Sequence, residues 1–254
     1  MVSRLLVRGM LVGVVAGLLC FGFLKIFGEP QVDRAIAFET QLDEAKAAEH
    51  KAMGMDMSKE EEPELVSRPV QAGIGLLTGV LVYSTAFGGL FALAFAFAYG
   101  RTPGASTPRS LAALLALIGF VAIYLVPNLK YPANPPSVGE PDTIGIRTAL
   151  YLTMIAISIA GMVAAVSLKR GLIARFDEWN STLVAAATYL ALMVVAGLLL
   201  PSINEVPDQF PAVVLWKFRT ASIGAQLIMW TTLGLLFGAL TQRASVNGRL
   251  LSYR

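Results

Sequence analysis

The feature that most constrains this chain is a run of 32 residues, 69–100, that contains no charged side chain. As a helix, this run would exceed the ~30 Å hydrocarbon core of a lipid bilayer. The whole chain is 56% hydrophobic and 15% charged, whereas soluble domains carry roughly a quarter charged residues. The sequence therefore predicts an all-α integral membrane protein.

Six apolar segments predict six transmembrane helices, at 5–27, 69–100, 110–126, 148–168, 183–200 and 212–240. The first resembles a secretory signal sequence, but no small-x-small cleavage site follows it, so we expect it to be retained. The chain then divides into a first helix at 1–27, an acidic extracytoplasmic insert at 28–68, helices two and three within 69–126, a proline-rich outer loop at 127–147, helices four to six with short loops within 148–240, and a cytoplasmic tail at 241–254.

Glycines spaced four residues apart predict close contacts between helices. Gly9, Gly13 and Gly17 place a smooth stripe on one face of the first helix, and such a stripe lets a neighbouring backbone approach closely. The same spacing recurs in the second and sixth helices, at Gly75 and Gly79 and at Gly234 and Gly238.

The segment 127–147 interrupts this apolar pattern with five prolines and two glycines in 21 residues. Each proline removes a backbone donor and clashes with the preceding helical turn, so the segment predicts a stiff loop rather than a helix. It also forms part of an internal repeat. Pro127 is followed after 20 residues by Arg147-Thr148, and Pro201 is followed after 18 residues by Arg219-Thr220.

An arginine marks the outer start of each even-numbered helix, at Arg68, Arg147 and Arg219. This pattern predicts three helical hairpins in the same orientation. In one interpretation the arginines only extend to the membrane interface. In the other they converge on an outer vestibule and pair with loop acids, because an unpaired guanidinium within a membrane is costly. The other residues of this vestibule would be Tyr131, Tyr151 and Gln226, with Glu140, Asp142, Glu205 or Asp208 as the pairing acids.

The distribution of charge predicts the orientation. One side, formed by both termini and the even-numbered loops, carries ten Lys and Arg residues and two acids. The other side also carries ten Lys and Arg residues, but six of them belong to the long insert and its flanks, and it holds 15 acids. Basic residues in short loops stay on the cytoplasmic side. We therefore expect both termini to be cytoplasmic.

The insert contains a candidate metal-binding cluster. It holds the only histidine of the chain and three nearby methionines: His50, Met53, Met55 and Met57. Thioethers suit Cu(I), whereas imidazole and carboxylate suit divalent ions such as cobalt or nickel. A single imidazole gives a weak site unless another subunit contributes ligands. A solvated linker that happens to contain methionines is the alternative.

Other functional classes are disfavoured by the composition. The single cysteine excludes an internal disulfide and a thiolate zinc cluster. No catalytic triad, nucleotide-binding loop or redox pair is present, so we expect no enzyme and no permanently bound cofactor. The basic residues are dispersed rather than gathered, so we expect no nucleic-acid partner. The helices contain no acidic residue, which disfavours a pump driven through an intramembrane carboxylate.

The proline loop resembles that of the CbtA family, the predicted cobalt transporter membrane subunits. The resemblance covers nearly the whole chain, including the six spans and the outer insert after the first. The residues that carry it most specifically are Pro127, Lys130, Tyr131, Pro132, Asn134, Pro135, Pro136, Val138, Gly139, Thr143, Arg147, Thr148 and Tyr151.

This resemblance implies a membrane subunit of a cobalt uptake transporter in the bacterial cytoplasmic (inner) membrane, with cobalt(II) or another divalent metal as substrate. It also implies a small single-span partner that bears histidines, CbtB. Many members have a histidine-rich outer loop, whereas this chain has only His50. We therefore expect the decisive ligands to come from the proline loop, at Asn134 and Glu140, or from the partner. A non-conducting scaffold or assembly subunit is the alternative.

Overall fold

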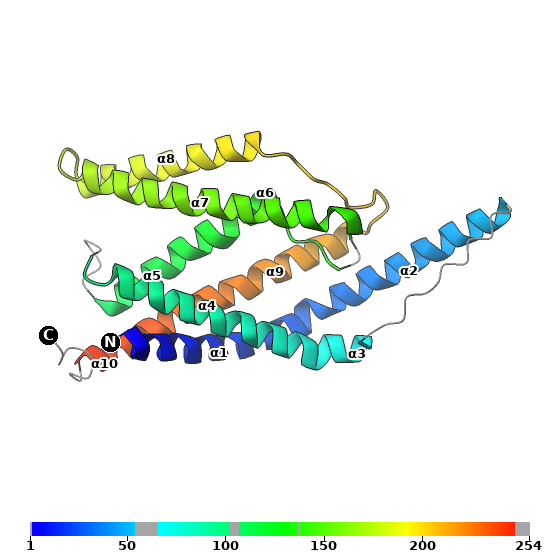
Figure 1. Cartoon of the computed structure of the whole chain (residues 1–254), viewed down its shortest axis with the longest axis horizontal. Helices are drawn as coiled ribbons and strands as arrows, with labels where there is room; N and C mark the ends of the chain where they lie inside the picture. Colours follow the sequence, from blue (N-terminus) through cyan, green and yellow to red (C-terminus); the bar gives the residue numbers. More distant parts are fainter. Residues whose placement is uncertain (1, 54–65, 102–106, 137, 247–254) are drawn as a thin grey trace.

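The computed structural model describes residues 2–53, 66–101, 107–136 and 138–246. Over these ranges the chain is helical with short connections (Figure 1), and six segments are long and apolar enough to cross a membrane. This confirms the predicted all-α class with six transmembrane helices. The spans are Val2–Phe27, Arg68–Ala98, Pro108–Lys130, Pro141–Leu172, Glu178–Leu199 and Ala212–Val246.

Four of the six spans consist of more than one helical element. Spans 1 and 5 are the single helices α1 (Val2–Phe27) and α8 (Glu178–Leu199). The composite spans are span 2, with α3 (Arg68–Val70), η1 (Gln71–Gly75) and α4 (Leu76–Ala98); span 3, with α5 (Pro108–Gly119), η2 (Phe120–Leu125) and α6 (Val126–Lys130); span 4, with η3 (Pro141–Thr143) and α7 (Ile144–Leu172); and span 6, with α9 (Ala212–Thr232), η4 (Leu233–Phe237) and α10 (Gly238–Val246).

The glycine stripe of α1 packs directly against α4. Gly9, Gly13 and Gly17 are all buried. A Cβ atom on Gly9 would overlap the carbonyl group of Gly88, and one on Gly13 would overlap that of Ser84. The two backbones therefore touch, as the small-residue spacing predicts.

The other two glycine pairs differ from each other. Gly234 and Gly238 face α5, where a Cβ atom on Gly234 would lie 2.7 Å from that of Ala116. The predicted contact at Gly75 and Gly79 is wrong. In the described structure, a Cβ atom on Gly79 would have no neighbour within 4 Å, and one on Gly75 would meet only Val70 of its own span.

The helices pack in pairs, of which only the first coincides with one of the expected hairpins. α1 packs along α4, α7 along α8, and α5 against η4 and α10, while α9 lies against α1 (Figure 1). The first span thus pairs with the second, the fourth with the fifth, and the third with the sixth. This packing does not show the three same-orientation hairpins that the arginine repeat predicts.

The insert begins with α2 (Glu29–Ala52), which follows α1 after a bend at Gly28 and projects from the bundle (Figure 1). Pro30 contributes to the bend because it has no N–H to bond the preceding turn. The base of α2 packs against the loops, where the buried Ala35 belongs to one cluster with Val138. In the same cluster Phe38 meets Phe210 edge-on, with 5.2 Å between the ring centroids.

The loop predicted for 127–147 is shorter than expected, because helix α6 continues through Pro127 to Lys130. The preceding element η2 is a π-helix, and its wider turn accommodates the missing N–H and the ring of the proline. Pro141 then begins the 3₁₀ turn η3, which leads into α7. Among the described residues, the non-helical part of the proline-rich segment is therefore confined to 131–136 and 138–140.

Candidate functional site

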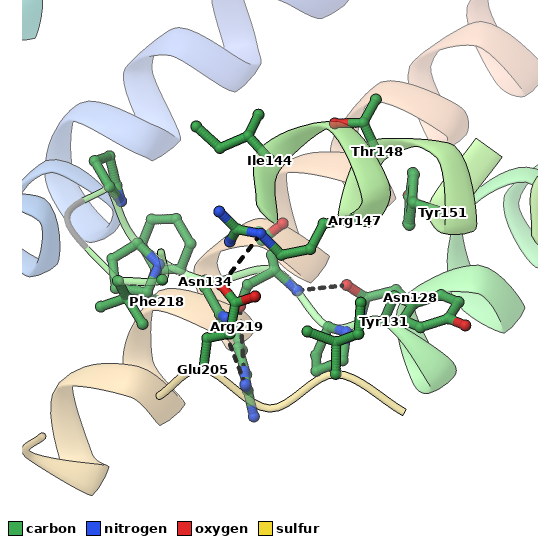
Figure 2. Close-up of a pocket in the computed structure, with 18 of the residues that line it drawn as sticks. Asn128, Tyr131, Asn134, Ile144, Arg147, Thr148, Tyr151, Glu205, Phe218 and Arg219 are labelled. Atoms are coloured by element: carbon green, nitrogen blue, oxygen red, sulfur yellow. Dashed lines mark hydrogen bonds and ion pairs between the residues drawn. The ribbon is translucent and has the colours of Figure 1, made fainter. Parts of the chain in front are cut away.

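A cavity of about 1060 Å³ lies at the end of the bundle opposite the two termini (Figures 1 and 2). We call it the distal cavity. Its walls come from α2, the end of span 3, the proline-rich loop, the start of α7, the 200–211 loop and α9. The lining residues are Glu39, Tyr124, Asn128, Tyr131, Pro132, Ala133, Asn134, Pro135, Pro136, Val138, Gly139, Pro141, Ile144, Arg147, Thr148, Tyr151, Leu152, Ile203, Asn204, Glu205, Phe218, Arg219 and Ser222.

Arg219, the repeat arginine of α9, holds the proline-rich loop. Its Nη2 donates to Oδ1 of Asn134 at 2.8 Å, and its Nε donates to the carbonyl oxygen of Ala133 at 3.2 Å (Figure 2). The loop is fixed from its other side as well, because the N–H of Ala133 donates to Oδ1 of the buried Asn128. The loop backbone is therefore clamped between α6 and α9.

Arg147, the repeat arginine of α7, holds the 200–211 loop. Its Nε lies 3.3 Å from Oε2 of Glu205, whose side chain is 11% exposed (Figure 2). Its Nη2 donates to the carbonyl oxygen of Glu140. The same carboxylate accepts the N–H of Glu140 at 2.9 Å. The Thr143 hydroxyl, the Glu140 N–H and the Arg147 guanidinium lower the pKa of the Glu205 carboxyl below its ordinary value of 4.5. Glu205 is therefore ionised at neutral pH.

The two loops also contact each other directly. The Tyr131 hydroxyl donates to the carbonyl oxygen of Pro201 at 2.8 Å, and the Lys130 ammonium donates to the Ser202 hydroxyl at 2.9 Å. Tyr131 follows the first proline of the repeat, and Pro201 is the second. Each repeat therefore supplies side chains that hold the loop of the other repeat.

Gly139 lies beside the ion pair between Arg147 and Glu205. Its φ is +117°, a region that residues with a side chain rarely adopt. A Cβ atom there would overlap Nη1 of Arg147 and lie 2.7 Å from Oε2 of Glu205. Only glycine fits at this position, both for its backbone angle and for the space that the ion pair needs.

The floor of the cavity is polar and leads toward the middle of the bundle. The Tyr124 hydroxyl of η2 lies 2.9 Å from the Ser222 hydroxyl of α9. One turn further along α9, Gln226 lies close to the Tyr83 hydroxyl of α4. These neutral donors and acceptors connect three spans beneath the cavity.

The residues predicted for the vestibule occupy three different places. Arg147, Arg219, Tyr131 and Tyr151 line the distal cavity, whereas Gln226 lies below it. Arg68 lies elsewhere, since it pairs with Glu29 and Asp33 of α2. The three arginines therefore do not converge at one mouth; Arg68 instead ties the base of the insert to span 2.

The predicted metal-binding residues are not brought together. His50 and Met53 are exposed at the far end of α2, about 18 Å along the helix from Phe38 at a rise of about 1.5 Å per residue. Asn134 lines the cavity and bonds Arg219, whereas the contacts at Glu140 are made by its backbone. Met55 and Met57 lie outside the described residues. Among the described residues, no three His, Cys, Asp or Glu side chains group closely enough to hold a metal ion.

Several lining residues carried no strong signal in the sequence. Ser222 is one helical turn after Arg219, so helical spacing from that arginine would have indicated it. Glu39 reaches the cavity from α2. No spacing rule places an insert helix over a particular pair of loops.

The comparison with known families agrees with the geometry of a membrane bundle. The family model described as "Probable cobalt transporter subunit (CbtA)" matches residues 2–242. No curated protein and no solved structure matches the chain significantly. Because the match covers nearly the whole chain, this multi-pass membrane protein belongs to the CbtA family of probable cobalt transporter subunits.

Proposed function

We propose that the chain conducts cobalt for an uptake transporter and that the distal cavity receives the substrate, with no catalysis and no permanently bound cofactor. The observation that carries the proposal is the cavity itself. It is formed by the ends of spans 3, 4 and 6, and its polar floor at Tyr124 and Ser222 points into the bundle. A scaffold without a transport path would need neither a hollow between the spans nor polar groups beneath it.

For the orientation we propose that both termini face the cytoplasm of the bacterium and that the distal cavity opens outward from the inner membrane. The charge distribution supports this arrangement, because the terminal side carries the basic short loops. In a Cys20→Ala background, a membrane-impermeant maleimide applied to intact cells should label Asp208→Cys but not Asp177→Cys. Labelling of Asp177→Cys in intact cells would reverse the orientation.

The family description as a subunit implies a partner. We propose a small single-span protein that bears histidines, of the CbtB type. The described residues of this chain offer no cluster of three metal-ligating side chains, whereas cobalt(II) binds readily to imidazole and carboxylate. The partner would gather the metal, and this chain would pass it across the membrane.

Radiocobalt uptake into proteoliposomes tests the conducting role. Vesicles that contain this chain and the partner should take up more cobalt than vesicles that contain the partner alone. Thr148→Trp should reduce this uptake, because Thr148 is an exposed lining residue and the indole would project into the cavity and narrow it.

The matched control is Thr220→Trp. Thr220 is the equivalent threonine of the second repeat, is also exposed, and does not line the cavity. It should keep normal uptake. Equal uptake by the two tryptophan variants would exclude the cavity as the route. If the folded chain adds no uptake to that of the partner alone, its role is that of a scaffold.

A further inference from the structure

The charges around the distal cavity are not those of a site for a bare cation. Four charged side chains line it: Glu39, Arg147, Glu205 and Arg219. Arg147 and Glu205 form an ion pair and largely cancel. Glu39 is exposed to solvent on α2, whereas Arg219 is half-buried. Among the described residues, Glu39 and Arg219 therefore have no ion-pair partner, and Arg219 is the less exposed of the two.

The Arg219 guanidinium has N–H donors beyond those that its two bonds to the loop use. Both of its protein partners are neutral oxygens, on Ala133 and Asn134, and they use Nε and one N–H of Nη2. A guanidinium has five N–H groups in a planar fork, so three remain without an acceptor in the part of the chain that the structure describes. Such a fork matches a carboxylate in a two-point contact, which is stronger than a hydrogen bond between neutral groups.

The size and the walls of the cavity suit an organic ligand. At about 1060 Å³ it is at the upper end of pockets that hold small organic molecules, roughly 300–1,000 Å³. A water molecule occupies only about 30 Å³ of liquid, so a hydrated ion would fill little of the space. Four aromatic rings supply apolar surface for a carbon skeleton: Tyr124, Tyr131, Tyr151 and Phe218.

We infer that the distal cavity receives cobalt as a complex with a carboxylate-bearing organic ligand, and that Arg219 recognises the carboxylate. This inference rests on the proposed function, because it names the form in which the transported metal arrives. The organic ligand supplies the metal's ligands, because no three His, Cys, Asp or Glu side chains group together among the described residues. It also lowers the charge of the metal so that a guanidinium no longer repels it. The metal-bearing end then faces the neutral oxygens of the floor at Tyr124 and Ser222.

Binding to the purified full-length chain in detergent tests this, with citrate, cobalt–citrate and aqueous cobalt chloride as separate probes in calorimetry. Cobalt–citrate should bind, and aqueous cobalt should bind much more weakly. Arg219→Gln should weaken cobalt–citrate binding by about tenfold or more, the scale of one charged hydrogen bond. Binding of citrate alone with the same dependence on Arg219 would show that the carboxylate is the recognised group.

Ser202→Ala separates recognition from support of the loops. It removes the Lys130–Ser202 contact between the two loops, but Ser202 does not line the cavity, so it should retain cobalt–citrate binding. An equal loss in Ser202→Ala and Arg219→Gln would assign Arg219 to loop support and overturn the inference. Tighter binding of aqueous cobalt than of cobalt–citrate, or binding indifferent to Arg219→Gln, would overturn it too.

Uptake assays distinguish failure of this inference from failure of the proposed function. Uptake from cobalt–citrate that exceeds uptake from aqueous cobalt supports both. Uptake of aqueous cobalt that excess citrate suppresses overturns the inference and leaves the transport function standing. Uptake of neither form overturns the transport function, and the calorimetry then decides by itself whether the cavity recognises carboxylates.

Discussion

Gly13→Leu is expected to separate α1 from α4 and to destabilise the whole bundle. A Cβ atom at Gly13 already overlaps the backbone at Ser84 and approaches Cα of Thr85, and a backbone cannot move aside as a flexible side chain can. Overpacking a tight core costs roughly 1–3 kcal/mol, occasionally more, and we expect the upper end of this range here. The measurement is the melting temperature and the monodisperse yield in detergent.

The same helix offers a matched control. Gly22 also lies on α1, and a Cβ atom there would have no described neighbour within 4 Å. Gly22→Leu should therefore leave the melting temperature close to that of the wild type. If both variants lost stability equally, the effect would reflect leucine in this helix generally rather than contact between the backbones of α1 and α4.

Much of the fold follows from local sequence patterns. Charge-free runs predict the six spans because a bilayer selects long apolar helices. The spacing of Gly9, Gly13 and Gly17 predicts a contact face because small residues are needed wherever two backbones touch. The same spacing fails at Gly75 and Gly79, which meet no other helix in the described structure. Spacing shows that a face is smooth, but not whether another helix lies against it.

The pairing of the helices depends on contacts between segments far apart in the sequence. The arginine repeat predicts consecutive hairpins, yet span 3 packs against span 6 and span 4 against span 5. Side chains far apart in the sequence contribute to this arrangement: the Trp230 ring of α9 lies against Gly119 of α5, and Met193 of α8 lies against Gly161 of α7. Periodicity along one helix does not identify such partners.

The candidate site was only partly predictable for a similar reason. The repeat indicated that Arg147 and Arg219 belong near the loops, and both line the cavity. It did not indicate that Arg219 binds the first loop while Arg147 binds the second. Arg68 shares the position of the other two along its helix, but nearby acids on α2 pair with it instead. A charged side chain binds the partner that the fold brings near it.

Gly139→Ala is expected to disrupt the distal cavity more than any other single-methyl change. The backbone there has φ +117°, and holding a residue with a side chain in such a region costs on the order of 1–3 kcal/mol. The added methyl group would also occupy the space between the Arg147 guanidinium and the Glu205 carboxylate. We expect a lower melting temperature and loss of most cobalt uptake.

Two further variants separate backbone strain from loss of the ion pair. Gly100 also has a positive φ, +77°, but a Cβ atom there would have no described neighbour within 4 Å, so Gly100→Ala reports strain alone. Gly139→Ala should lower the melting temperature more than this control. Introduced into a Glu205→Ala background, where the carboxylate is already gone, it should cost less than in the wild type, because residues in contact are not additive. Full additivity of the two changes would mean that Gly139 serves only its own backbone angle and does not make room for the ion pair between the two repeats.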